Sequence, residues 1–423
     1  MIRFLIKGVF RDRHRYLFPL IIVSCGVLIM IFMLALINGY MDSFIRSNAG
    51  FETGHLKVVS RAYSDIIAQK PYDLSLLDIQ SALDQWKKRY PQLEWTERIQ
   101  LGALLDVPDA TGETREQGEI IVYGIDLLKS GMERKLLNLD KALARGRIPS
   151  QPGEALVSEQ ALERLKLKIG DPVTLIGSDI YGSLAFHRLV ISGTINFGAE
   201  ALDRGALMAD ISDIRQMLDM PGGAAEILAF FKDGRYDQKE ADRIKADFNQ
   251  TFSDPRDEYS PVMLAMSDQN NMGYLMGIVH SMLGIFSFVF IVILGIVLWN
   301  SGLMNGIRRY GEFGVRLAVG ESKKHIFGTL VLEAVAIGVV GSAIGILLGS
   351  LGCWYFNIHG MDVSVFTRNS TLFTQDIIYT YIPLHTALAG FIPGVLSTVL
   401  GAILAGLAVF KRQTSQLFKE LEV

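Results

Sequence analysis

The sequence predicts an integral membrane protein with four transmembrane α-helices and a mixed α+β domain inserted between helices 1 and 2. Half of its 423 residues are hydrophobic, yet 20% are charged, which fits a protein with both membrane and water-facing parts. Four apolar runs are long enough to span a membrane, and residues 40–271 instead carry charges every few positions. At about 100–200 residues per domain, the length leaves room for a membrane part and one or two soluble units.

Each membrane-spanning helix is predicted from the length of an apolar run. A bilayer core about 30 Å thick requires roughly 20 apolar residues in a helix, because lipid cannot hydrogen-bond an open backbone. The segments that meet this requirement are 17–38, 277–299, 326–351 and 383–410. The first is too long for the apolar part of a signal peptide and no small-residue cleavage site follows it, so we expect it to be retained. Pro393 is expected to kink the fourth.

Basic residues predict the orientation, because Lys and Arg accumulate on the cytoplasmic side of a membrane protein. They cluster in segments 1–16, 300–325 and 411–423, which all fall on one side of the predicted spans. Both termini are therefore predicted to be cytoplasmic, and the domain 40–271 and the loop 352–382 periplasmic. Segment 1–16 alternates basic and apolar residues, which indicates either an interfacial helix or a flank that only sets the topology.

The domain at 40–271 contains short runs with the periodicity of strands and helices. The strand-like runs are 54–60, 99–107, 120–125, 172–176, 187–194 and 227–232, and the helix-like stretches are 74–90, 158–167, 211–218 and 236–249. Their alternation predicts an α+β fold. Residues 108–118 are expected to form a long exposed hairpin loop, and 253–261 a linker back to the membrane.

No enzymatic constellation is found in the sequence. Motifs of zinc proteases and serine hydrolases are absent, and residues 314–323 lack the Gly-Lys-Ser/Thr ending of a phosphate-binding loop. His55, His187 and His280 are interpreted as structural polar residues. The two cysteines indicate neither a disulfide framework nor a metal site, and 41 basic against 44 acidic residues give no reason to expect nucleic-acid binding. We therefore predict that the chain is not an enzyme and holds neither a metal nor a cofactor.

The segment after the second span carries an ordered set of charged and small residues. The set comprises Arg309, Glu312, Val315, Arg316, Leu317, Ala318, Gly320, Lys323 and Lys324, followed by Glu333 in the third span. It resembles the signature of the FtsX/LolC/LolE/MacB superfamily of ABC transporter permeases. Segment 124–218, with Gly-Glu-Ala-Leu-Val-Ser at 153–158 and Leu-Lys-Ile-Gly-Asp at 167–171, resembles the MacB-like periplasmic core domain. The layout is closest to the lipoprotein-releasing LolC/LolE permeases.

The resemblance implies a permease subunit in the bacterial inner membrane. Such a subunit couples ATP hydrolysis on a separate cytosolic ATPase dimer, which holds ATP and Mg²⁺, to movement of its periplasmic domain. It also implies a second permease copy, identical or related, contact with membrane lipid, and extraction of lipoprotein or another lipid-linked cargo, with a periplasmic carrier as a further partner. The alternatives are export of a peptide, antibiotic or lipid in the manner of MacB, and FtsX-like regulation of cell-wall hydrolases. The tail 411–423 departs from the family because it lacks the usual Pro.

The residues expected to matter fall into three groups. Contact with the ATPase is assigned to Arg309, Glu312, Phe313, Arg316, Leu317, Gly320, Lys323 and Lys324. Arg309, Glu312 and Arg316 lie at i, i+3 and i+7, which places them on one face of a short helix. The alternative is a solvated loop whose basic residues only set the topology. Glu333 is interpreted as the partner of Arg308 or Arg316, or as a transport residue. Gly341, Gly345 and Gly349 are expected to allow close helix packing within the subunit or against its dimer mate.

Overall fold

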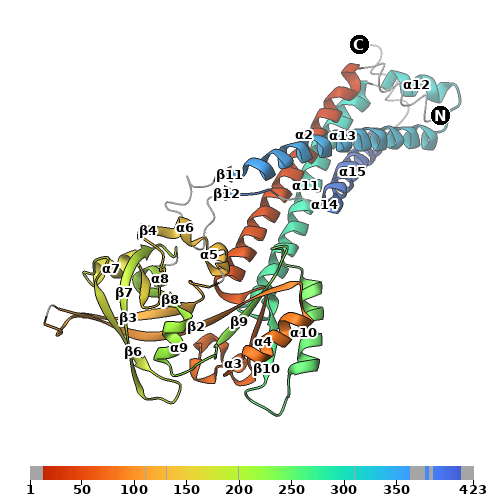
Figure 1. The fold of residues 1–423 in the computed structure, drawn as a ribbon. Helices are drawn as coiled ribbons and strands as arrows, with labels where there is room; N and C mark the ends of the chain where they lie inside the picture. The colour runs from red at the N-terminus through yellow and green to blue at the C-terminus, as the bar shows by residue number, and fades with distance from the viewer. Residues whose placement is uncertain are drawn as a thin grey trace. The chain divides into compact units, whose positions relative to one another are not determined.

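The computed structural model describes residues 13–109, 111–129, 131–198, 200–308, 310–362, 377–380 and 384–410. These residues form two compact units (Figure 1). We call Met1–Met41, Gly277–Met361 and Ile378–Val423 the helical unit, and Asp42–Met276 with Asp362–Ile377 the large domain. Most of the predicted segment 1–16, Arg309, most of the loop 352–382 and the tail 411–423 lie outside the described residues.

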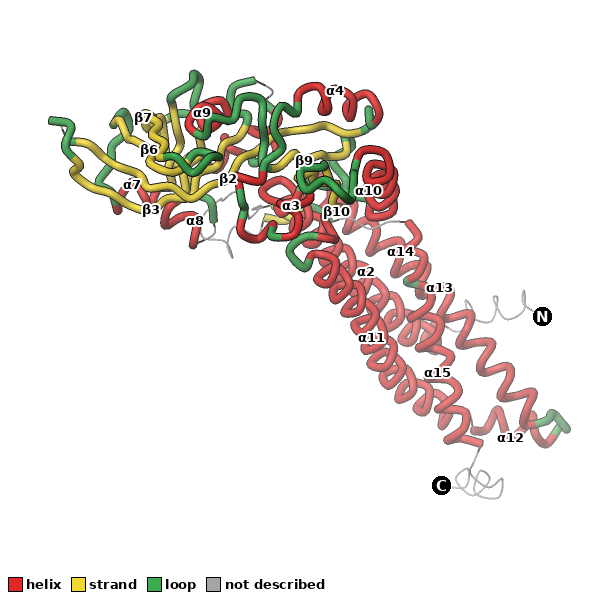
Figure 2. Tube along the Cα trace, turned by 90° about the horizontal axis from the view of Figure 1, so that it is seen from below, coloured by secondary structure: helices red, strands yellow, loops and turns green. Residues whose placement is uncertain are grey.

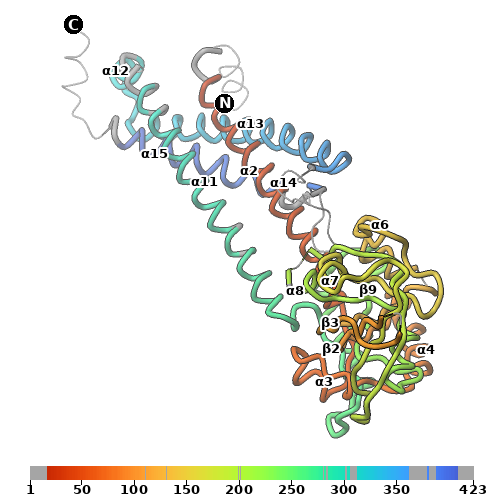
Figure 3. Tube along the Cα trace, turned by 90° about the vertical axis from the view of Figure 1, so that its left-hand side faces the viewer, coloured from red at the N-terminus to blue at the C-terminus, as the bar shows by residue number. Residues whose placement is uncertain are grey.

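The helical unit is built from long apolar helices. Its elements are α2 (Arg13–Asn48), α11 (Met272–Arg308), α12 (Tyr310–Ala318), α13 (Lys323–His359), α14 (Leu384–Ala389) and α15 (Phe391–Phe410). Within the described residues, four of these helices, α2, α11, α13 and α15, are long and apolar enough to cross a membrane (Figure 3). Together with the α+β domain between the first and second of them, they confirm the predicted fold class.

The fourth predicted span is interrupted close to Pro393, at Gly390. The chain turns at Gly390, where the N–H of Gly390 donates to the carbonyl of Ala387 and separates α14 from α15. Pro393 lies in the first turn of α15. A proline is tolerated in the first turn because the N–H that it lacks has no partner within the helix there.

Small residues bring α13 against α2. A methyl group added at each of three α13 glycines would lie 2.9, 2.8 and 2.9 Å from side-chain carbons of α2. The pairs are Gly341 with Val23, Gly345 with Val27, and Gly349 with Ile31. Both helices use residues four apart, so they pack along their length. The glycine stripe therefore packs within the subunit, which is one of the two arrangements that its spacing predicted.

Other glycines seat the remaining helices of the unit. On α13, Gly338 packs against Val395 and Thr398 of α15. The helix α11 also packs against glycines, with Leu294 over Gly26 of α2 and Leu298 over Gly401 of α15. Small residues thus set the helix contacts throughout this unit.

The large domain contains one sheet of ten strands in the described residues (Figure 2). The strands are β1 (Leu56–Ser60), β2 (Leu93–Pro108), β3 (Thr114–Ile125), β4 (Leu143–Gly146), β5 (Glu154–Ser158), β6 (Pro172–Ser178), β7 (Leu184–Ile195), β8 (Ala206–Asp210), β9 (Glu226–Phe231) and β10 (Pro261–Ala265). The order is β10-β1-β9-β2-β3-β8-β5-β7-β4, and β6 pairs with both β2 and β7. Only β3 with β8 and β5 with β7 are parallel, so the sheet is mixed.

The double pairing of β6 closes part of this sheet into a barrel. Hydrogen bonding runs from β2 through β3, β8, β5, β7 and β6 and back to β2. Closure leaves these six strands without a free edge between them. The largest buried cluster contains side chains from all six strands, among them Leu105, Val122, Val157, Val173 and Leu189. The strand β2 also pairs through its first half with β9, so it belongs to both the barrel and the open extension β9-β1-β10.

Short helices cover the sheet. They are α3 (Arg61–Asp65), α4 (Gln80–Arg89), α5 (Met132–Leu136), α6 (Leu139–Ala142), α7 (Glu159–Arg164), α8 (Glu200–Gly205), α9 (Ile211–Met217) and α10 (Gln238–Phe252), with single turns η2 (Ile67–Gln69), η3 (Tyr72–Leu74) and η4 (Met266–Asp268). A five-residue π-helix, η1 (Ala49–Thr53), follows α2 directly. In α4 and α10, Trp86 and Phe248 pack together with ring centroids 5.1 Å apart over the open extension.

Both loops predicted from the sequence are present, but each differs in part from the prediction. The expected hairpin at 108–118 is confirmed, but its loop is short, because β3 begins at Thr114 and pairs with β2 up to Pro108. Asp109 closes the short turn by accepting from the N–H groups of Thr111 and Glu113. Residues 253–260 form a loop as expected, but this loop leads into β10, which pairs with β1, so it lies within the domain. Polarity overestimated the length of the first loop, because strand pairing also uses polar, exposed residues.

The chain runs into the large domain and out of it at one place. The last residues of α2 and the first of α11 that belong to this domain share an apolar cluster with β9. The cluster includes Phe44, Ile45, Ala49, Leu228, Phe230, Met266, Met272 and Met276. The two ends of the domain are therefore packed together.

Candidate functional site

The predicted coupling segment contains the short amphipathic helix α12. Phe313 is buried and packs with Ile326 in the first turn of α13, and Leu317 and Leu330 lie against them. Apolar residues at 313 and 317 are four apart, so they share one face of the helix. This face holds α12 on the start of α13.

The turn between α12 and α13 has fixed geometry. The N–H of Gly320 donates to the carbonyl of Leu317, and the N–H of Glu321 donates to that of Arg316, which is the Schellman arrangement at a helix end. Gly320 has φ +98°, which a residue with a side chain adopts only with strain. Ser322 then caps α13 by accepting from the N–H of His325. These hydrogen bonds at the end of α12 and the start of α13 therefore fix the orientation of α12 relative to α13.

The opposite face of α12 is open and carries both apolar and charged groups. Val315 and Val319 are 65% and 83% exposed. Glu312 and Arg316 are also exposed, and Arg316 lies 3.8 Å from Glu321, whose other carboxylate oxygen lies 3.4 Å from His325. Lys323 and Lys324 extend the exposed charge onto α13. We call Glu312, Val315, Arg316, Val319, Lys323 and Lys324 the α12 face.

The structure divides the residues that were assigned to coupling into two roles. Phe313, Leu317 and Gly320 position α12, and their assignment to a partner contact stays a prediction. Val319, which no charge pattern indicated, is the most exposed apolar residue of the segment. Only its place on the outer side of an anchored helix reveals it. Glu333 is half-buried in α13, and the described ion pair of Arg316 is with Glu321.

A second cluster of polar side chains lies in the large domain and was not found from the sequence. Its first part is Arg98 on β2, which is 5% exposed and donates through Nε and Nη2 to both oxygens of Glu133, at 2.7 and 2.6 Å. Its Nη1 and Nη2 also donate to the carbonyls of Phe51 and Gly50 in the π-helix, both at 2.6 Å. A bidentate pair of this kind fixes the geometry of the residues that it joins. Arg98 therefore ties η1 to the sheet.

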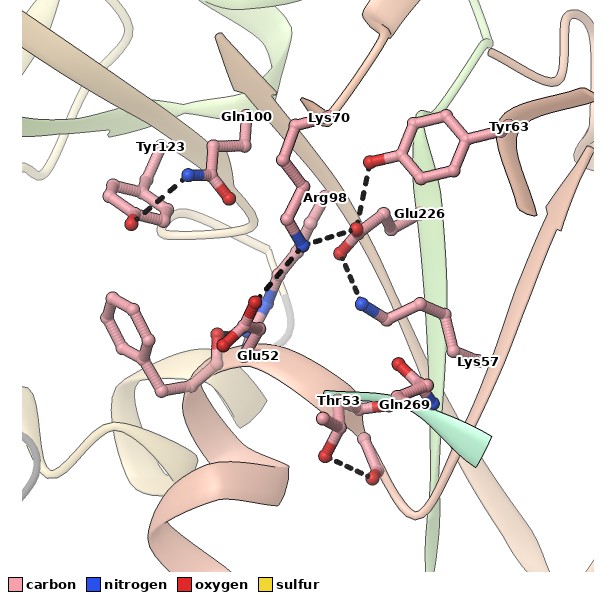
Figure 4. Close-up of polar contacts among 12 residues, drawn as sticks. Glu52, Thr53, Lys57, Tyr63, Lys70, Arg98, Gln100, Tyr123, Glu226 and Gln269 are labelled. Atoms are coloured by element: carbon pink, nitrogen blue, oxygen red, sulfur yellow. Dashed lines mark hydrogen bonds and ion pairs between the residues drawn. The ribbon is translucent and has the colours of Figure 1, made fainter. Parts of the chain in front are cut away.

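The second part of this cluster surrounds Glu226 on β9 (Figure 4). One carboxylate oxygen accepts from the hydroxyl of Tyr63 and from Nζ of Lys70, both at 2.8 Å, and the other lies 2.9 Å from Nζ of Lys57. Burial acts to raise the pKa of Glu226, but the ammonium groups of Lys57 and Lys70 outweigh it and lower this pKa. Burial lowers the pKa of Lys57 to about 8 against the attraction of Glu226. We call Lys57, Tyr63, Lys70 and Glu226 the Glu226 cluster.

Histidines and acidic residues in the described parts of the chain do not gather into a metal-binding group. His55 is buried and accepts at Nδ1 from the N–H of Phe231, at 3.0 Å, with its ring against Phe230, Phe231 and Tyr236. His187 lies 3.3 Å from Asp213, which also accepts from the N–H of Gly153. These contacts are structural. The side chain of His280 lies outside those described.

Most of the helical unit matches a known protein family. The FtsX-like permease C-terminal family matches residues 284–414, which include α12 and its face. An uncharacterized ABC transporter permease protein of Mycobacterium tuberculosis is 21% identical over 233 residues, covering 51% of this chain and 25% of that protein. These matches support the resemblance to the FtsX/MacB superfamily of ABC transporter permeases.

Further matches involve MacB proteins. The macrolide export ATP-binding/permease protein MacB of Campylobacter fetus is 28% identical over 95 residues, covering 21% of this chain and 15% of that protein. The chain thus spans a quarter or less of the length of the curated relatives that it matches. The crystal structure of the periplasmic region of MacB from Actinobacillus actinomycetemcomitans has a TM-score of 0.35 and 11% identity, covering 52% of this chain and 91% of that structure.

Proposed function

We propose that this chain is the permease subunit of an ABC transporter and that its α12 face binds a separate cytosolic ATPase dimer. The observation that carries this proposal is a short helix anchored inward by Phe313 that presents Val315 and Val319 outward beside Glu312 and Arg316. Exposed apolar residues within a charged rim are the composition of a protein contact. A helix laid into a groove of a partner is a common form of such a contact.

The work proposed for the subunit is to transmit nucleotide-driven closure of the ATPase dimer to the large domain. ATP and Mg²⁺ are held by the ATPase in this proposal, and a second permease copy completes the assembly. The cargo proposed is a lipoprotein or another lipid-linked molecule taken from the outer face of the inner membrane. Support for this cargo comes from the chain layout, a four-helix permease with a large inserted domain, which resembles the lipoprotein-releasing permeases.

Reversing charge or polarity on the α12 face tests the ATPase contact. The full chain is co-expressed with its co-encoded ATPase and purified in detergent as wild type, Val319→Glu and Arg316→Glu. Both variants should lose most of the co-purifying ATPase. The control is Arg243→Glu, a charge reversal at an exposed arginine on α10 of the large domain, which should retain the ATPase. Retention of the ATPase by both α12 variants, with unchanged hydrolysis, would show that the contact lies elsewhere.

A second experiment tests the cargo. Release of a purified lipoprotein from proteoliposomes is measured with the ATPase and ATP present, and ATP hydrolysis is followed with and without that lipoprotein. The name of the Campylobacter fetus relative favours a second candidate, export of a macrolide or similar compound. Stimulation of hydrolysis by a macrolide but not by a lipoprotein would replace the first cargo with the second. Stimulation by neither would favour a regulator of cell-wall hydrolases.

The proposed orientation places α12 in the cytoplasm and the large domain in the periplasm. Basic residues beside the apolar helices support it. In a chain without Cys25 and Cys353, Glu113→Cys in the β2–β3 turn should react with an impermeant thiol reagent on intact spheroplasts. Lys324→Cys should react only after lysis, and the reverse pattern would invert the topology. Both positions are exposed, so access to the reagent depends on the membrane.

A further inference from the structure

A polar cavity opens in the large domain beside the Glu226 cluster. Its volume is about 200 Å³, which is room for roughly six molecules of water at about 30 Å³ each. The lining residues come from η1, the loop after η2, β2, β3, α8 and β9. They are Phe51, Glu52, Lys70, Arg98, Ile99, Gln100, Tyr123, Leu202 and Glu226. Figure 4 labels the polar residues among them.

Two of the charged residues of this wall are fully engaged by the protein. Glu226 already has three partners, and the guanidinium of Arg98 is committed to Glu133 and to two carbonyls of η1. Separating either group from these partners would leave a buried charge without compensation, which costs several kcal/mol. They shape the cavity, and a ligand would leave them as they are.

The pair between Lys70 and Glu52 differs from these contacts. Nζ of Lys70 lies 3.5 Å from Oε1 of Glu52 but 2.8 Å from Glu226. The side chain of Glu52 is 37% exposed, against 6% for Glu226. A long, partly hydrated ion pair contributes little and is easily exchanged. Lys70 also has φ +51°, so the fold holds this lysine over the cavity in a conformation that is unfavourable for a residue with a side chain.

Uncharged hydrogen-bonding groups lie on another side of the same cavity. Gln100 donates through Nε2 to the hydroxyl of Tyr123 at 3.3 Å, and this is the one hydrogen bond that the described structure gives to either side chain. The hydroxyl proton of Tyr123 and the amide oxygen of Gln100 remain for a ligand. Burial raises the pKa of Tyr123, so its hydroxyl stays protonated at neutral pH. The rings of Phe51 and Tyr123, with centroids 5.2 Å apart, provide an apolar surface beside these groups.

We propose that this cavity binds a small zwitterion that replaces the ion pair between Lys70 and Glu52. The acidic group of the ligand forms an ion pair with the ammonium of Lys70, and the ammonium of the ligand forms an ion pair with the carboxylate of Glu52. Three cations, Lys57, Lys70 and Arg98, face three anions, Glu52, Glu133 and Glu226, so the surroundings are balanced in charge. A zwitterion preserves this balance, whereas a simple anion or cation leaves one charge of the exchanged pair without a partner.

The cavity lies against the π-helix that ends α2. Phe51 and Glu52 both belong to η1, and Arg98 holds the carbonyls of this helix from the other side. A ligand on Glu52 therefore acts on the segment through which the chain runs into the large domain. The size of the cavity limits the ligand to a free amino acid or a phosphoethanolamine group, which share the required ammonium and acid.

Calorimetric titration of the purified full chain tests this binding site. Glycine and phosphoethanolamine are the zwitterionic probes, whereas inorganic phosphate and ethylammonium each carry charge of one sign only. At least one zwitterion should bind saturably, and at least tenfold more tightly than either single ion. Tighter binding of glycine assigns a free amino acid, and tighter binding of phosphoethanolamine assigns a lipid headgroup. Failure of both zwitterions to bind, or equal binding of phosphate, overturns the proposal.

Variants locate the binding site within the chain. Glu52→Gln keeps the shape of a partly exposed side chain and should weaken binding at least tenfold. Glu113→Gln, on the exposed β2–β3 turn, should leave it unchanged. Lys70→Gly removes the ammonium while glycine accepts the backbone conformation, and Glu226 keeps Tyr63 and Lys57 as partners, so it provides a second variant if the first is poorly folded. Unchanged affinity in both cavity variants would refute the site, and neither variant touches the α12 face, so ATPase binding is tested separately.

Discussion

The helical unit and the large domain differ in what fills their tightest contacts. Along α13, glycines remove side chains so that the backbone approaches Val23, Val27 and Ile31 of α2. In the large domain, fixed charges fill the space around Glu226 and Arg98, and hydrogen bonds compensate for their burial. Adding a side chain should destabilise the glycine contacts of the helical unit, and removing a charged group should destabilise the large domain. The four predictions below test this difference, in order of decreasing effect.

Removing the carboxylate of Glu226 should have the largest effect. Lys57 is 1% exposed and would remain buried without its partner, so Glu226→Gln should lower the free energy of unfolding of the large domain by about 3–5 kcal/mol. Thermal unfolding of the detergent-purified chain, followed by near-ultraviolet circular dichroism, measures the loss. Glu226→Leu combined with Lys57→Met should recover most of it. A loss below about 1 kcal/mol for Glu226→Gln would mean that the charges are not coupled.

Acid should weaken the large domain through His55. Burial lowers the pKa of His55 from 6.5 to about 4, opposed by Asp233 and assisted by Arg46. His55 therefore stays unprotonated in the folded chain at a pH where it takes up a proton in the unfolded chain. The free energy of unfolding consequently falls by about 3 kcal/mol as the pH drops from about 6.5 to 4. His55→Asn keeps an acceptor for the N–H of Phe231 and should flatten this pH dependence. An equally steep acid transition in the variant would assign it to other groups.

Adding a side chain should disturb the helical unit by less. The Cβ of Gly345→Val would lie 2.8 Å from Val27 and 2.7 Å from the carbonyl oxygen of Ser24, so α13 and α2 must move apart. We expect a loss of about 1–3 kcal/mol, seen as a lower midpoint in detergent unfolding. Gly352→Val on the same helix is the matched control, because a Cβ there meets nothing within 4 Å. Similar losses at both positions would trace the effect to helix propensity.

The smallest effect is expected at the end of α12. Gly320→Ala imposes a side chain at φ +98° and should weaken the turn by about 1 kcal/mol. The predicted readout is faster backbone hydrogen exchange in residues 310–320 with an unchanged unfolding midpoint of the large domain. Gly314→Ala, where a Cβ meets nothing within 4 Å, should slow exchange or leave it as it is. Unaltered exchange in Gly320→Ala would show that the turn does not hold α12.

Features set by local spacing were predictable. Apolar length gave the four helices, and glycines four apart gave the face of α13 that meets α2. The charges at Glu312 and Arg316 placed α12, although only its packing separated Phe313, which anchors the helix, from Val319, which is exposed. The break in the fourth span was also predictable, because Pro393 cannot donate a hydrogen bond to the preceding turn, where Gly390 separates α14 from α15.

The Glu226 cluster was out of reach for sequence reasoning. Lys70 and Glu226 are 156 positions apart, and Arg98 and Glu133 are 35 apart, so no periodicity connects them. Barrel closure was equally hidden, because it depends on β6 pairing with β2 and β7 at once. One local sign was present, since Lys57 lies within β1 and Glu226 begins the otherwise apolar strand β9. A charged residue in a buried strand requires a partner, but the local sequence does not show which residue that partner is.

The shared apolar cluster at the two ends of the large domain bears on how such a chain can evolve. Phe44 at the end of α2 and Met272 at the start of α11 meet in that cluster, so some 230 residues begin and finish at one point. A segment with adjacent ends can be inserted between two host elements in a single recombination event without separating them. The domain can therefore be enlarged, reduced or exchanged as a module, and a new specificity can be acquired without rebuilding the helices that bear α12.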